Sequence, residues 1–589
     1  MATTETTVRG GVCPIKSMYV REAPSKVVLA MPSTPVPSPA AALTEGPRAA
    51  DSASGNGPAD GDDDVDDETA TTATPSDPQP QRLRGMNKGA ERAHVFVAGS
   101  GDKPVFEGEH NFFFGPTLSR VKIALKLDKQ QQQAGGGQQP KRGRDGAPGS
   151  HHAAPPPTTT AAADALSSAP IADVTSAVPL TSSSSAAPGE LAALWVVPSR
   201  DDEPPAVRRQ RLFSNKLILA PLTTVGNLPY RRICKSFGAD VTLSEMSLAY
   251  NLNHTQKSEW SLLRRHESED IFGIQIATKN EWEAATVAKL LKASEFSYDY
   301  VDVNCGCPVE LICQQGCGCG LWEKKGRMKG VVENLTRYQD QPVTVKCRIG
   351  RDEADPQLHK HIGEYESWGA SAVTIHGRSR KQRYTKLANW EYINDCANRT
   401  QLPVIGNGDI MSYEDVAERR AQFPALSSHM IARGALIKPW VFTEIKERRT
   451  WDISSHERLE MLKKFAAFGL SHWGADAKGV HTTRRFMCEW LSFLCRYVPV
   501  GLLERLPQRI NDRPPYYMGR DDLETLMASD SVEDWIRITE LLLGPCGPDF
   551  KFTPKHKSNS YASNLSGLTV SGAEVASAAA IDLVGEVEG

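Results

Sequence analysis

Residues 343–349 read VTVKCRI, and seven further apolar runs of six or seven residues occur between residues 213 and 447. Most are rich in Val and Ile, which favour strands. Several are followed by enough chain for a helix, such as NEWEAATVAKLLKA at 280–293. Eight strand-then-helix units within roughly 220 residues predict a (β/α)8 barrel. The other runs are LILAPL (217–222), VTLSEM (241–246), IFGIQI (271–276), YVDVNC (300–305), AVTIHG (372–377), PVIGNGD (403–409) and HMIARG (429–434).

A doubly wound open sheet is the alternative arrangement for alternating strands and helices. The sequence disfavours it, because no G-x-G-x-x-G follows the first run, where a dinucleotide-binding fold carries that turn. We therefore expect an α/β protein built on a TIM barrel.

The chain on either side of the barrel has a different composition. After Asp452 the strand pattern stops and amphipathic segments such as ERLEMLKKFAAFGLSHW predict helices. Before residue 205, Ala, Pro, Ser, Thr, Gly and Asp dominate, and such chain buries too little apolar area to offset an entropy cost of about 1–2 kcal/mol per residue. We predict four regions: a disordered arm (1–205), a barrel (206–447), a helical domain (448–557) and a disordered tail (558–589).

Two islands interrupt the low-complexity arm. They read GVCPIKSMYV (11–20) and RLRGMNKGAERAHVFV (82–97). Each is either a short docking segment or a locally apolar stretch, and the sequence leaves both interpretations open.

Charge and hydropathy exclude several classes of protein. The 68 Lys and Arg nearly balance the 71 Asp and Glu, so the formal charge is −3 and any RNA-binding surface must be local. The sequence contains no apolar run of roughly 18–20 residues and no apolar stretch of a secretory signal at its start. We expect a soluble monomer without a membrane partner, in the cytoplasm or nucleus, with its twelve cysteines as thiols.

Polar residues that end the predicted strands are the candidates for an active site, because barrel enzymes place it at the carboxyl ends of the strands. Lys346 would project into the barrel mouth and could stabilise an anionic ring system, unless it forms an interior salt bridge. Glycines after the last two runs indicate a phosphate-bearing cofactor. The candidates are Pro221, Leu222, Thr223, Gln275, Asn304, Cys307, Lys346, Arg348, His376, Arg378, Asn407, Gly408, Asp409, Ala432 and Arg433.

The same residues carry a family resemblance. The chain resembles the tRNA-dihydrouridine synthases over about residues 205–560, and its continuation LSFLCRYVPVGLLERLPQRINDRPPYY (491–517) is similar to the eukaryotic tRNA-dihydrouridine(47) synthase type. The motifs occur in the family's order: APLTTVGNLPYRRICKSFGAD (220–240), FGIQI (272–276), DVNCGCP (302–308), VKCRIG (345–350), TIHGRSRKQRYTKLANW (374–390), IGNGDI (405–410) and ARGALIKPWVFTEIKE (432–447).

This resemblance implies an FMN-bound barrel, a helical tRNA-binding domain and NADPH- or NADH-driven reduction of a uridine C5–C6 double bond. Cys307 matches the catalytic cysteine of the family's Asn-x-Gly-Cys-Pro motif. An unperturbed thiol, with a pKa of about 8.5, is protonated at pH 7 and is therefore able to act as the acid. By the same resemblance Pro221, Leu222, Thr223, Gln275 and Lys346 bind the flavin ring, with Asn304 orienting flavin or substrate. The ribityl phosphate is surrounded by His376, Asn407, Gly408, Asp409, Ala432 and Arg433.

Five cysteines close together permit another interpretation. Cys305, Cys307, Cys313, Cys317 and Cys319 could supply a zinc or iron–sulfur site. Their spacing differs from that of usual structural zinc pairs, and small apolar packing is the expected role of all but Cys307. We predict no metal.

The loop HGRSRKQRYTK (376–386) presents cations around Tyr384 at the barrel mouth. Cations contact phosphates and an aromatic ring stacks a base, so the loop is expected to bind RNA unless it is only a solvated charged loop. The surface would extend over further cations after the barrel, although some of them are expected to pair with Glu489 or Glu504 instead. These are Arg484, Arg485, Arg496, Arg505, Arg509, Arg513, Lys551, Lys555 and Lys557.

One departure concerns zinc fingers, which eukaryotic members of this type usually carry upstream of the barrel. Cys13 is the only cysteine before Cys234, and a single thiol cannot build a Cys3His finger. We therefore expect weaker RNA affinity than in finger-bearing relatives. Two other functions remain open from the sequence: a flavin-dependent reductase of a free pyrimidine or quinone, and a catalytically silent RNA-binding protein.

Overall fold

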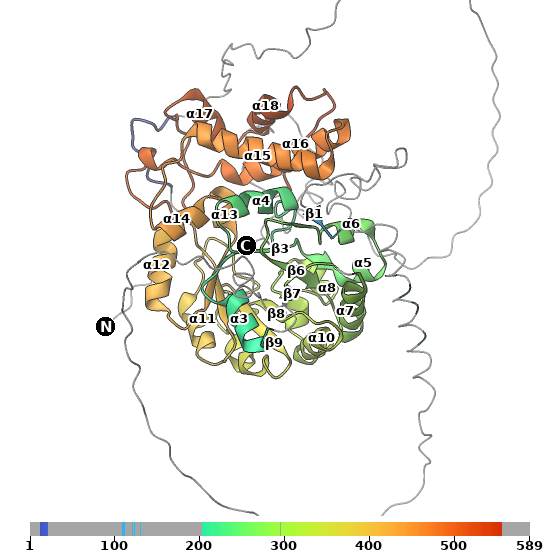
Figure 1. The fold of residues 1–589 in the computed structure, drawn as a ribbon. Helices are drawn as coiled ribbons and strands as arrows, with labels where there is room; N and C mark the ends of the chain where they lie inside the picture. The colour runs from blue at the N-terminus through green and yellow to red at the C-terminus, as the bar shows by residue number, and fades with distance from the viewer. Residues whose placement is uncertain are drawn as a thin grey trace, which may run out of the picture.

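The computed structural model describes residues 12–21, 109–111, the single positions 121, 123, 126 and 130, and residues 203–294 and 296–555. A barrel lies below a layer of helices (Figure 1). The predictions for the island at 82–97, for most of the arm and for the tail fall outside the described residues.

Eight parallel strands form the closed barrel. Each strand pairs with the next along the chain, β11 pairs with β2, and β3 pairs with β6 across a two-strand insertion, so the ring has no open edge. Each of the eight predicted runs contains a strand, and the TIM-barrel prediction is confirmed. The strands are β2 (Leu217–Leu219), β3 (Val241–Leu243), β6 (Ile271–Ala277), β7 (Tyr300–Cys305), β8 (Val343–Arg348), β9 (Ala370–His376), β10 (Val404–Asn407) and β11 (Ser428–Ile431).

Alternation along the strands separates two environments. In β8, Val343, Val345 and Cys347 are fully buried and belong to the main hydrophobic core. The alternate residues Thr344 and Lys346 point the other way, as successive side chains in a strand must. The interior of the barrel is consequently polar, whereas its outer face packs on helices.

Helices surround the barrel and extend its loops (Figure 1). They are α3 (Pro205–Phe213), α4 (Leu228–Ser236), α5 (Ala249–Asn253), α6 (Lys257–Ser261), α7 (Glu281–Ser294), α8 (Glu310–Gln314), α9 (Cys319–Trp322), α10 (Lys325–Tyr338), α11 (Trp390–Ala397), α12 (Tyr413–Gln422), α13 (Arg433–Ile437) and α14 (Val441–Glu447), with short 3₁₀ turns η4 (Leu358–Lys360) and η5 (Ile362–Glu364). Strand β4 (Ser247–Leu248) pairs with the end of β6.

The helical region contains α15 (Ser455–Trp473), α16 (Ala477–Leu494), η6 (Val500–Leu502), α17 (Asp522–Ala528) and α18 (Val532–Leu543). A capping box between Ser454 and Glu457 starts α15, which packs on both α16 and α4 of the barrel. The indole N–H of buried Trp490 donates to Leu436 O at 3.0 Å, which joins α16 to α13. The helical region therefore packs directly on the barrel, and the two share one hydrophobic core.

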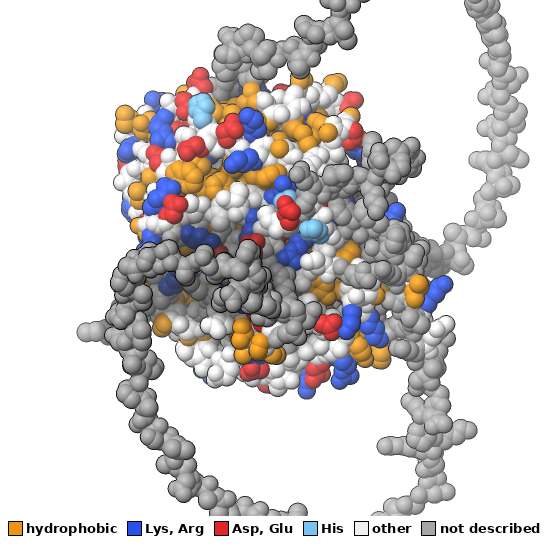
Figure 2. All heavy atoms as spheres, viewed as in Figure 1, with side chains coloured by type: hydrophobic (Ala, Val, Ile, Leu, Met, Phe, Trp, Pro, Cys, Tyr) orange, Lys and Arg blue, Asp and Glu red, His pale blue; other side chains and the backbone are white. Residues whose placement is uncertain are grey.

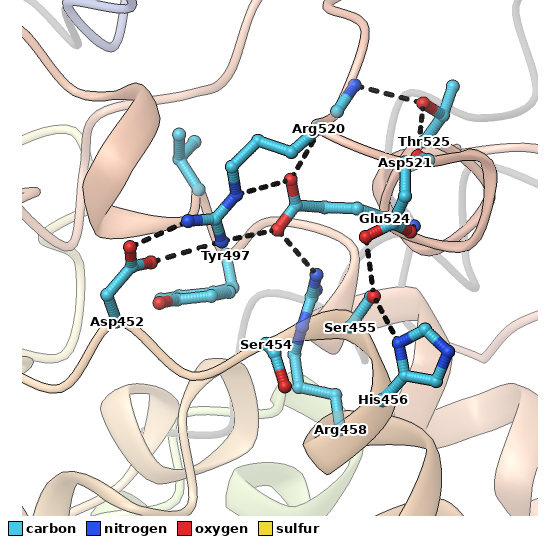
Figure 3. Close-up of polar contacts among 12 residues, drawn as sticks. Asp452, Ser454, Ser455, His456, Arg458, Tyr497, Arg520, Asp521, Glu524 and Thr525 are labelled. Carbon is cyan, nitrogen blue, oxygen red and sulfur yellow. Dashed lines mark hydrogen bonds and ion pairs between the residues drawn. The ribbon is translucent and has the colours of Figure 1, made fainter.

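An ion-pair network also ties the start of the helical region to α17 (Figure 3). Arg520 lies between two carboxylates, with Nη1 2.7 Å from Asp452 Oδ2 and Nη2 2.7 Å from Glu524 Oε1. Arg458 Nη2 lies 3.6 Å from the same oxygen of Glu524, and both side chains are almost wholly buried. The chain leaving the barrel is thus held against a helix about 70 residues further on.

Residues 12–21, which cover most of the first island, pack against the helical region. Cys13 and Ile15 are buried in a small cluster with Val498, Leu502, Leu503 and Tyr517. Figure 1 shows this blue segment beside the orange loops. The docking interpretation of the island agrees with these contacts.

A second piece of the arm inserts between barrel and helices. Strand β1 (Glu109–His110) pairs antiparallel with β5 (Arg265–His266). The buried Glu109 carboxylate lies 3.0 Å from His472 Nδ1 and 3.5 Å from Arg264 Nη1. Neither contact was expected from the composition of the arm.

On the face seen in Figure 2, Lys and Arg side chains are interspersed with Asp and Glu. This mixing is consistent with the nearly balanced charge of the chain. Within the described residues, the helices are all too short or too polar to cross a membrane.

Candidate functional site

A chain of hydrogen bonds crosses three neighbouring strands inside the barrel. Asn304 Nδ2 donates to Gln275 Oε1 at 2.9 Å, and Gln275 Nε2 donates to Asp302 Oδ2 at 2.8 Å. Thr344 Oγ1 donates to the other oxygen of Asp302 at 2.6 Å. Burial raises the pKa of Asp302, although both neighbours donate to it. The network fixes the amide orientation of Gln275 and Asn304.

Cys307 lies just beyond the end of β7, and its backbone is held on both sides. Asn304 Oδ1 accepts the N–H of Cys307 at 2.9 Å. The carbonyl of Cys307 accepts the N–H of Cys319 at 3.0 Å and the thiol of Cys313 at 3.4 Å. Of the five clustered cysteines, Cys307 alone is partly exposed. It is therefore the thiol of this loop that is placed to meet a substrate.

The other four cysteines are buried, and Cys313 among them also donates its thiol to the carbonyl of Cys307. Cys305 is fully buried, and Cys317 lies in an apolar cluster with Met246 and Leu248. In the part of the chain that the structure describes, no group of three or more His, Cys, Asp or Glu side chains is arranged to hold a metal ion.

Lys346 stands between Asn304 and Thr374 in strand register, half-buried in the barrel mouth. Burial and the nearby Arg348 lower its pKa to about 8, while Asp302 opposes the shift. Among the described residues Lys346 has no ion-pair partner within 4.0 Å, so the salt-bridge alternative is not observed. The ammonium remains available to a bound group.

Arg348 joins the Cys307 loop to the loop after β9. Its Nε donates to Gly306 O at 2.9 Å and its Nη1 donates to Ser379 O at 3.0 Å. Arg348 was a candidate by its place at a strand end, but no specific role was predicted for it. Its position at a strand end, two residues after Lys346, was the only feature of the sequence that could have indicated this contact between the loops.

Asp409 anchors two guanidinium groups at the ends of β9 and β11. Arg378 Nη2 lies 2.7 and 2.8 Å from its two oxygens, and Arg433 Nη2 lies 3.1 Å from Oδ1. Ala388 N–H also donates to Asp409, at 2.7 Å. The Tyr384 ring centroid lies 4.0 Å from Arg433 Cζ. Asp409 therefore positions Arg378 and Arg433 around one niche at the ends of these strands.

A small cavity beside this niche contains unsatisfied polar atoms. His376 and Asn407 line it with Gly408, Ala432 and Arg433, and Ile510 of the helical region closes one side. His376 Nδ1 and Asn407 Oδ1 are buried and have no hydrogen-bond partner among the described residues. Burial and the surrounding cations hold the pKa of His376 well below its usual range, so the ring is neutral. Such orphaned atoms fit a polar ligand.

Gly408 lies where the backbone passes close to the side chain of Ala388, beside the same cavity. Its φ is +136°, and an added Cβ would lie 2.5 Å from Ala388 Cβ. Only glycine combines that backbone conformation with the available space.

Pro221, Leu222 and Thr223 follow β2, at the same end of the barrel. Leu222 is buried, whereas Pro221 and Thr223 are partly exposed. Glu245 accepts the N–H of Thr224 at 2.6 Å and so holds this loop to the next strand's end. Among the described residues, no hydrogen bond or ion pair joins these three to the other predicted site residues. The flavin-binding roles of these three residues, like those of the other predicted site residues, remain predictions.

Most cations of the loop after β9 are paired. Arg378 is fully buried on Asp409, and Arg380 contacts Glu310 and Glu323 at 2.9 and 2.7 Å. Lys381 pairs with Asp352, and Lys386 with Glu353. The local sequence shows five cations, but carboxylates from elsewhere in the chain neutralise most of this loop.

Residues 218–481 match the sequence profile described as dihydrouridine synthase (Dus). The chain therefore contains a region that matches the dihydrouridine synthase family. A relative named tRNA-dihydrouridine(47) synthase [NAD(P)(+)]-like from Xenopus tropicalis is 57% identical over 350 residues, covering 59% of this chain and 54% of the relative. The relative of that name from Homo sapiens is 54% identical over 358 residues, covering 61% and 55%.

The relative of that name from Oryza sativa subsp. japonica is 53% identical over 361 residues, covering 61% of this chain and 53% of the relative. The chain thus spans about half the length of the curated relatives it matches. Solved structures align weakly: a morphinone reductase covers 40% of the chain at 11% identity and a TM-score of 0.30.

The Dus match begins in β2 and ends in α16. It contains every predicted site residue from Pro221 to Arg433. Residues 12–21, which pack on the helical region, and Ile510, which lines the cavity with His376 and Asn407, lie outside the match.

Proposed function

We propose that this protein reduces the C5–C6 double bond of a uridine in tRNA, with FMN as its cofactor and NADPH or NADH as reductant. The observation that carries the proposal is the placement of Cys307 at the rim of a polar barrel that also presents Lys346 and the orphaned atoms of His376 and Asn407. Relatives more than 50% identical carry names of this activity.

Cys307 is assigned the proton-transfer role. Its loop is pinned through both backbone groups, so Sγ occupies a defined place at the mouth while the side chain stays partly exposed. In the reaction the S–H bond of Cys307 breaks and its proton goes to C5 of the uracil ring. The resulting thiolate is reprotonated from water.

The residues around the mouth fit a flavin nucleotide. Gln275 and Asn304 present fixed amides, and Lys346 places a cation beside them. The niche of His376, Asn407, Gly408, Asp409, Ala432 and Arg433 would hold the ribityl phosphate, with Arg433 as its cation. When bound and reduced by NADPH or NADH, FMN would supply the hydride that adds to C6 of the uracil ring.

The substrate must present a single uracil to this mouth. A base inside a helix cannot reach the barrel, so the target uridine leaves its stack. The relatives' names indicate uridine 47 as the target position. We further propose that the protein acts as a monomer in the cytoplasm or nucleus.

Purified protein tests this function directly. We expect flavin absorbance after isolation, and reoxidation of the reduced flavin when unmodified tRNA is added, with dihydrouridine appearing at one position. Reoxidation by free uracil or quinones but not by tRNA would instead support a small-molecule reductase. Colourless protein that cannot be loaded with FMN would contradict both.

A further inference from the structure

The loop at residues 504–513, between η6 and α17, carries three exposed arginines. Among the described residues, the guanidinium groups of Arg505, Arg509 and Arg513 have no ion pair and no hydrogen bond. This differs from the loop after β9, where carboxylates neutralise most cations. Unpaired arginines keep their full capacity to contact phosphate.

The acidic residues of the loop do not compensate these charges. Asp512 is 8% exposed and is used internally, because Oδ2 accepts the N–H of Arg509 at 3.0 Å. Glu504 is exposed, and its N–H donates to Pro14 O at 2.9 Å. Its carboxylate is not within ion-pair distance of any described cation.

The docked N-terminal segment holds this loop in shape. Cys13 N–H donates to Arg513 O at 2.7 Å, and Lys16 N–H donates to Leu502 O at 2.9 Å. Ile15 is buried with Leu502 and Leu503, directly before the loop. Lys16 is itself exposed, and its ammonium donates to Gly501 O at 2.7 Å without a carboxylate partner among the described residues. We call this site the 504–513 surface. It consists of three arginines of the loop and the adjoining lysine of the N-terminal segment: Arg505, Arg509, Arg513 and Lys16.

This surface adjoins the barrel mouth. Ile510, in the middle of the loop, lines the cavity that also contains His376, Asn407 and Arg433. Arg496 Nη2 donates to Ile510 O at 3.4 Å, while its buried Nε has no partner among the described residues. Burial lowers the pKa of Arg496 to about 10, and the nearby Arg513 and Arg433 add to the shift. Arg496 therefore lies electrostatically between Arg513 of the loop and Arg433 of the niche, whose own charge is paired with Asp409.

We propose that the 504–513 surface binds the phosphate backbone of the RNA substrate beside the flipped uridine, and that residues 12–21 are part of this site because they hold its shape. The inference rests on the proposed function. The planar guanidinium groups of the three arginines and the ammonium group of Lys16 suit backbone phosphates, which are regularly spaced and exposed. The position beside Ile510 puts the contact next to the barrel mouth, where the extruded nucleotide must enter.

The test uses the full-length, FMN-loaded protein and a fluorescently labelled, unmodified tRNA transcript. Binding is measured by anisotropy between roughly 50 and 200 mM salt, the range over which phosphate contacts weaken strongly. The triple variant Arg505→Ala, Arg509→Ala, Arg513→Ala should bind at least about 10-fold more weakly. Its log–log salt slope should be smaller by about 2 to 3, roughly one for each lost phosphate contact.

A matched triple variant removes the same charge from the paired loop: Arg380→Ala, Lys381→Ala, Lys386→Ala. Its tRNA affinity should stay within about 2-fold of the wild type, because those cations are already neutralised. Replacing the three loop arginines by Lys should restore most of the affinity. Ile15→Asp, which disturbs the support of the loop, should weaken tRNA binding without removing any cation.

Failure of this inference is distinguishable from failure of the proposed function. If wild-type protein binds no tRNA, the proposed function fails. If wild-type protein binds and the Ala triple binds equally with an unchanged salt slope, the inference is overturned. It is equally overturned if the Ala triple loses FMN but keeps tRNA binding, since the surface would then serve the cofactor. Circular dichroism and flavin content confirm that each variant is folded.

Discussion

Asn304 Oδ1 accepts the backbone N–H of Cys307 at 2.9 Å, so the last polar side chain of β7 positions a residue three places further on. The same Asn304 donates through Nδ2 to Gln275. One side chain thus couples the proposed acid to a residue predicted to contact the flavin. The contacts make Asn304 a positioning residue.

Asn304→Ala should lower dihydrouridine formation on the order of 10- to 100-fold, because Cys307 loses its backbone acceptor and a displacement of about 1 Å is enough for such a loss. Asn304→Asp keeps an acceptor for Cys307 but loses the donor to Gln275. It should therefore recover much of the turnover while binding FMN more weakly. Equal loss in both variants, with unchanged FMN affinity, would contradict this division of roles.

Cys307→Ala should retain flavin and tRNA binding while dihydrouridine formation falls at least about 100-fold, since a positioned general acid contributes that much or more. Cys305→Ala is the matched control, because Cys305 is two residues away but fully buried. Product is quantified in single-turnover assays with pre-reduced protein. Unchanged turnover in Cys307→Ala would remove Cys307 from its assigned role.

Lys346 should make the stability of the flavin-free protein depend on pH. Its pKa is about 8 in the folded chain, against about 10.4 for an ordinary lysine. Between these values the unfolded chain binds a proton that the folded chain does not, so the free energy of unfolding rises with pH. Below about pH 8 both states are protonated and this contribution is flat.

The measurement is urea unfolding from pH 7 to 10.5, comparing wild type with Lys346→Met. The difference between the two proteins isolates Lys346 from cysteines and tyrosines that titrate in the same window. A difference that stays constant with pH would show that the pKa of Lys346 is not lowered.

Glu524→Ala should destabilise the helical region by about 3–5 kcal/mol, because it leaves the buried Arg458 without its carboxylate and breaks the contacts to Arg520 (Figure 3). Thermal and urea unfolding report the change. Lys463→Ala breaks an exposed pair with Glu460 on α15 and should shift stability by no more than about 1 kcal/mol. Similar shifts in both variants would contradict the structural role of the network.

Glu109→Ala should also destabilise the protein by about 3–5 kcal/mol, since the buried Arg264 and His472 lose their shared carboxylate. His110→Ala, on the same strand but exposed, should change stability by less than about 0.5 kcal/mol. Limited proteolysis and urea unfolding distinguish the two. Identical stability of Glu109→Ala and wild type would mean that the arm is not anchored there.

The barrel strands and the position of Cys307 were both predictable from local patterns. Runs such as VTVKCRI and YVDVNC have the length and residue types of buried strands, and the polar residues that follow them necessarily meet at one end of a parallel barrel. Cys307 could be singled out because it follows such a strand within a recognisable motif. These features depend on residues close together in the chain.

Pairing between distant residues was decided by the tertiary structure. The loop after β9 reads as a cationic surface, yet Arg378 turns inward to Asp409 and Arg380 meets Glu310 and Glu323. Glu109 contacts His472, which lies 363 positions further along the sequence. Whether a charge is exposed or neutralised depends on which side chains packing brings within a few ångströms, and no local periodicity encodes that. The arginines of residues 504–513 emerged as the unpaired ones for the same reason.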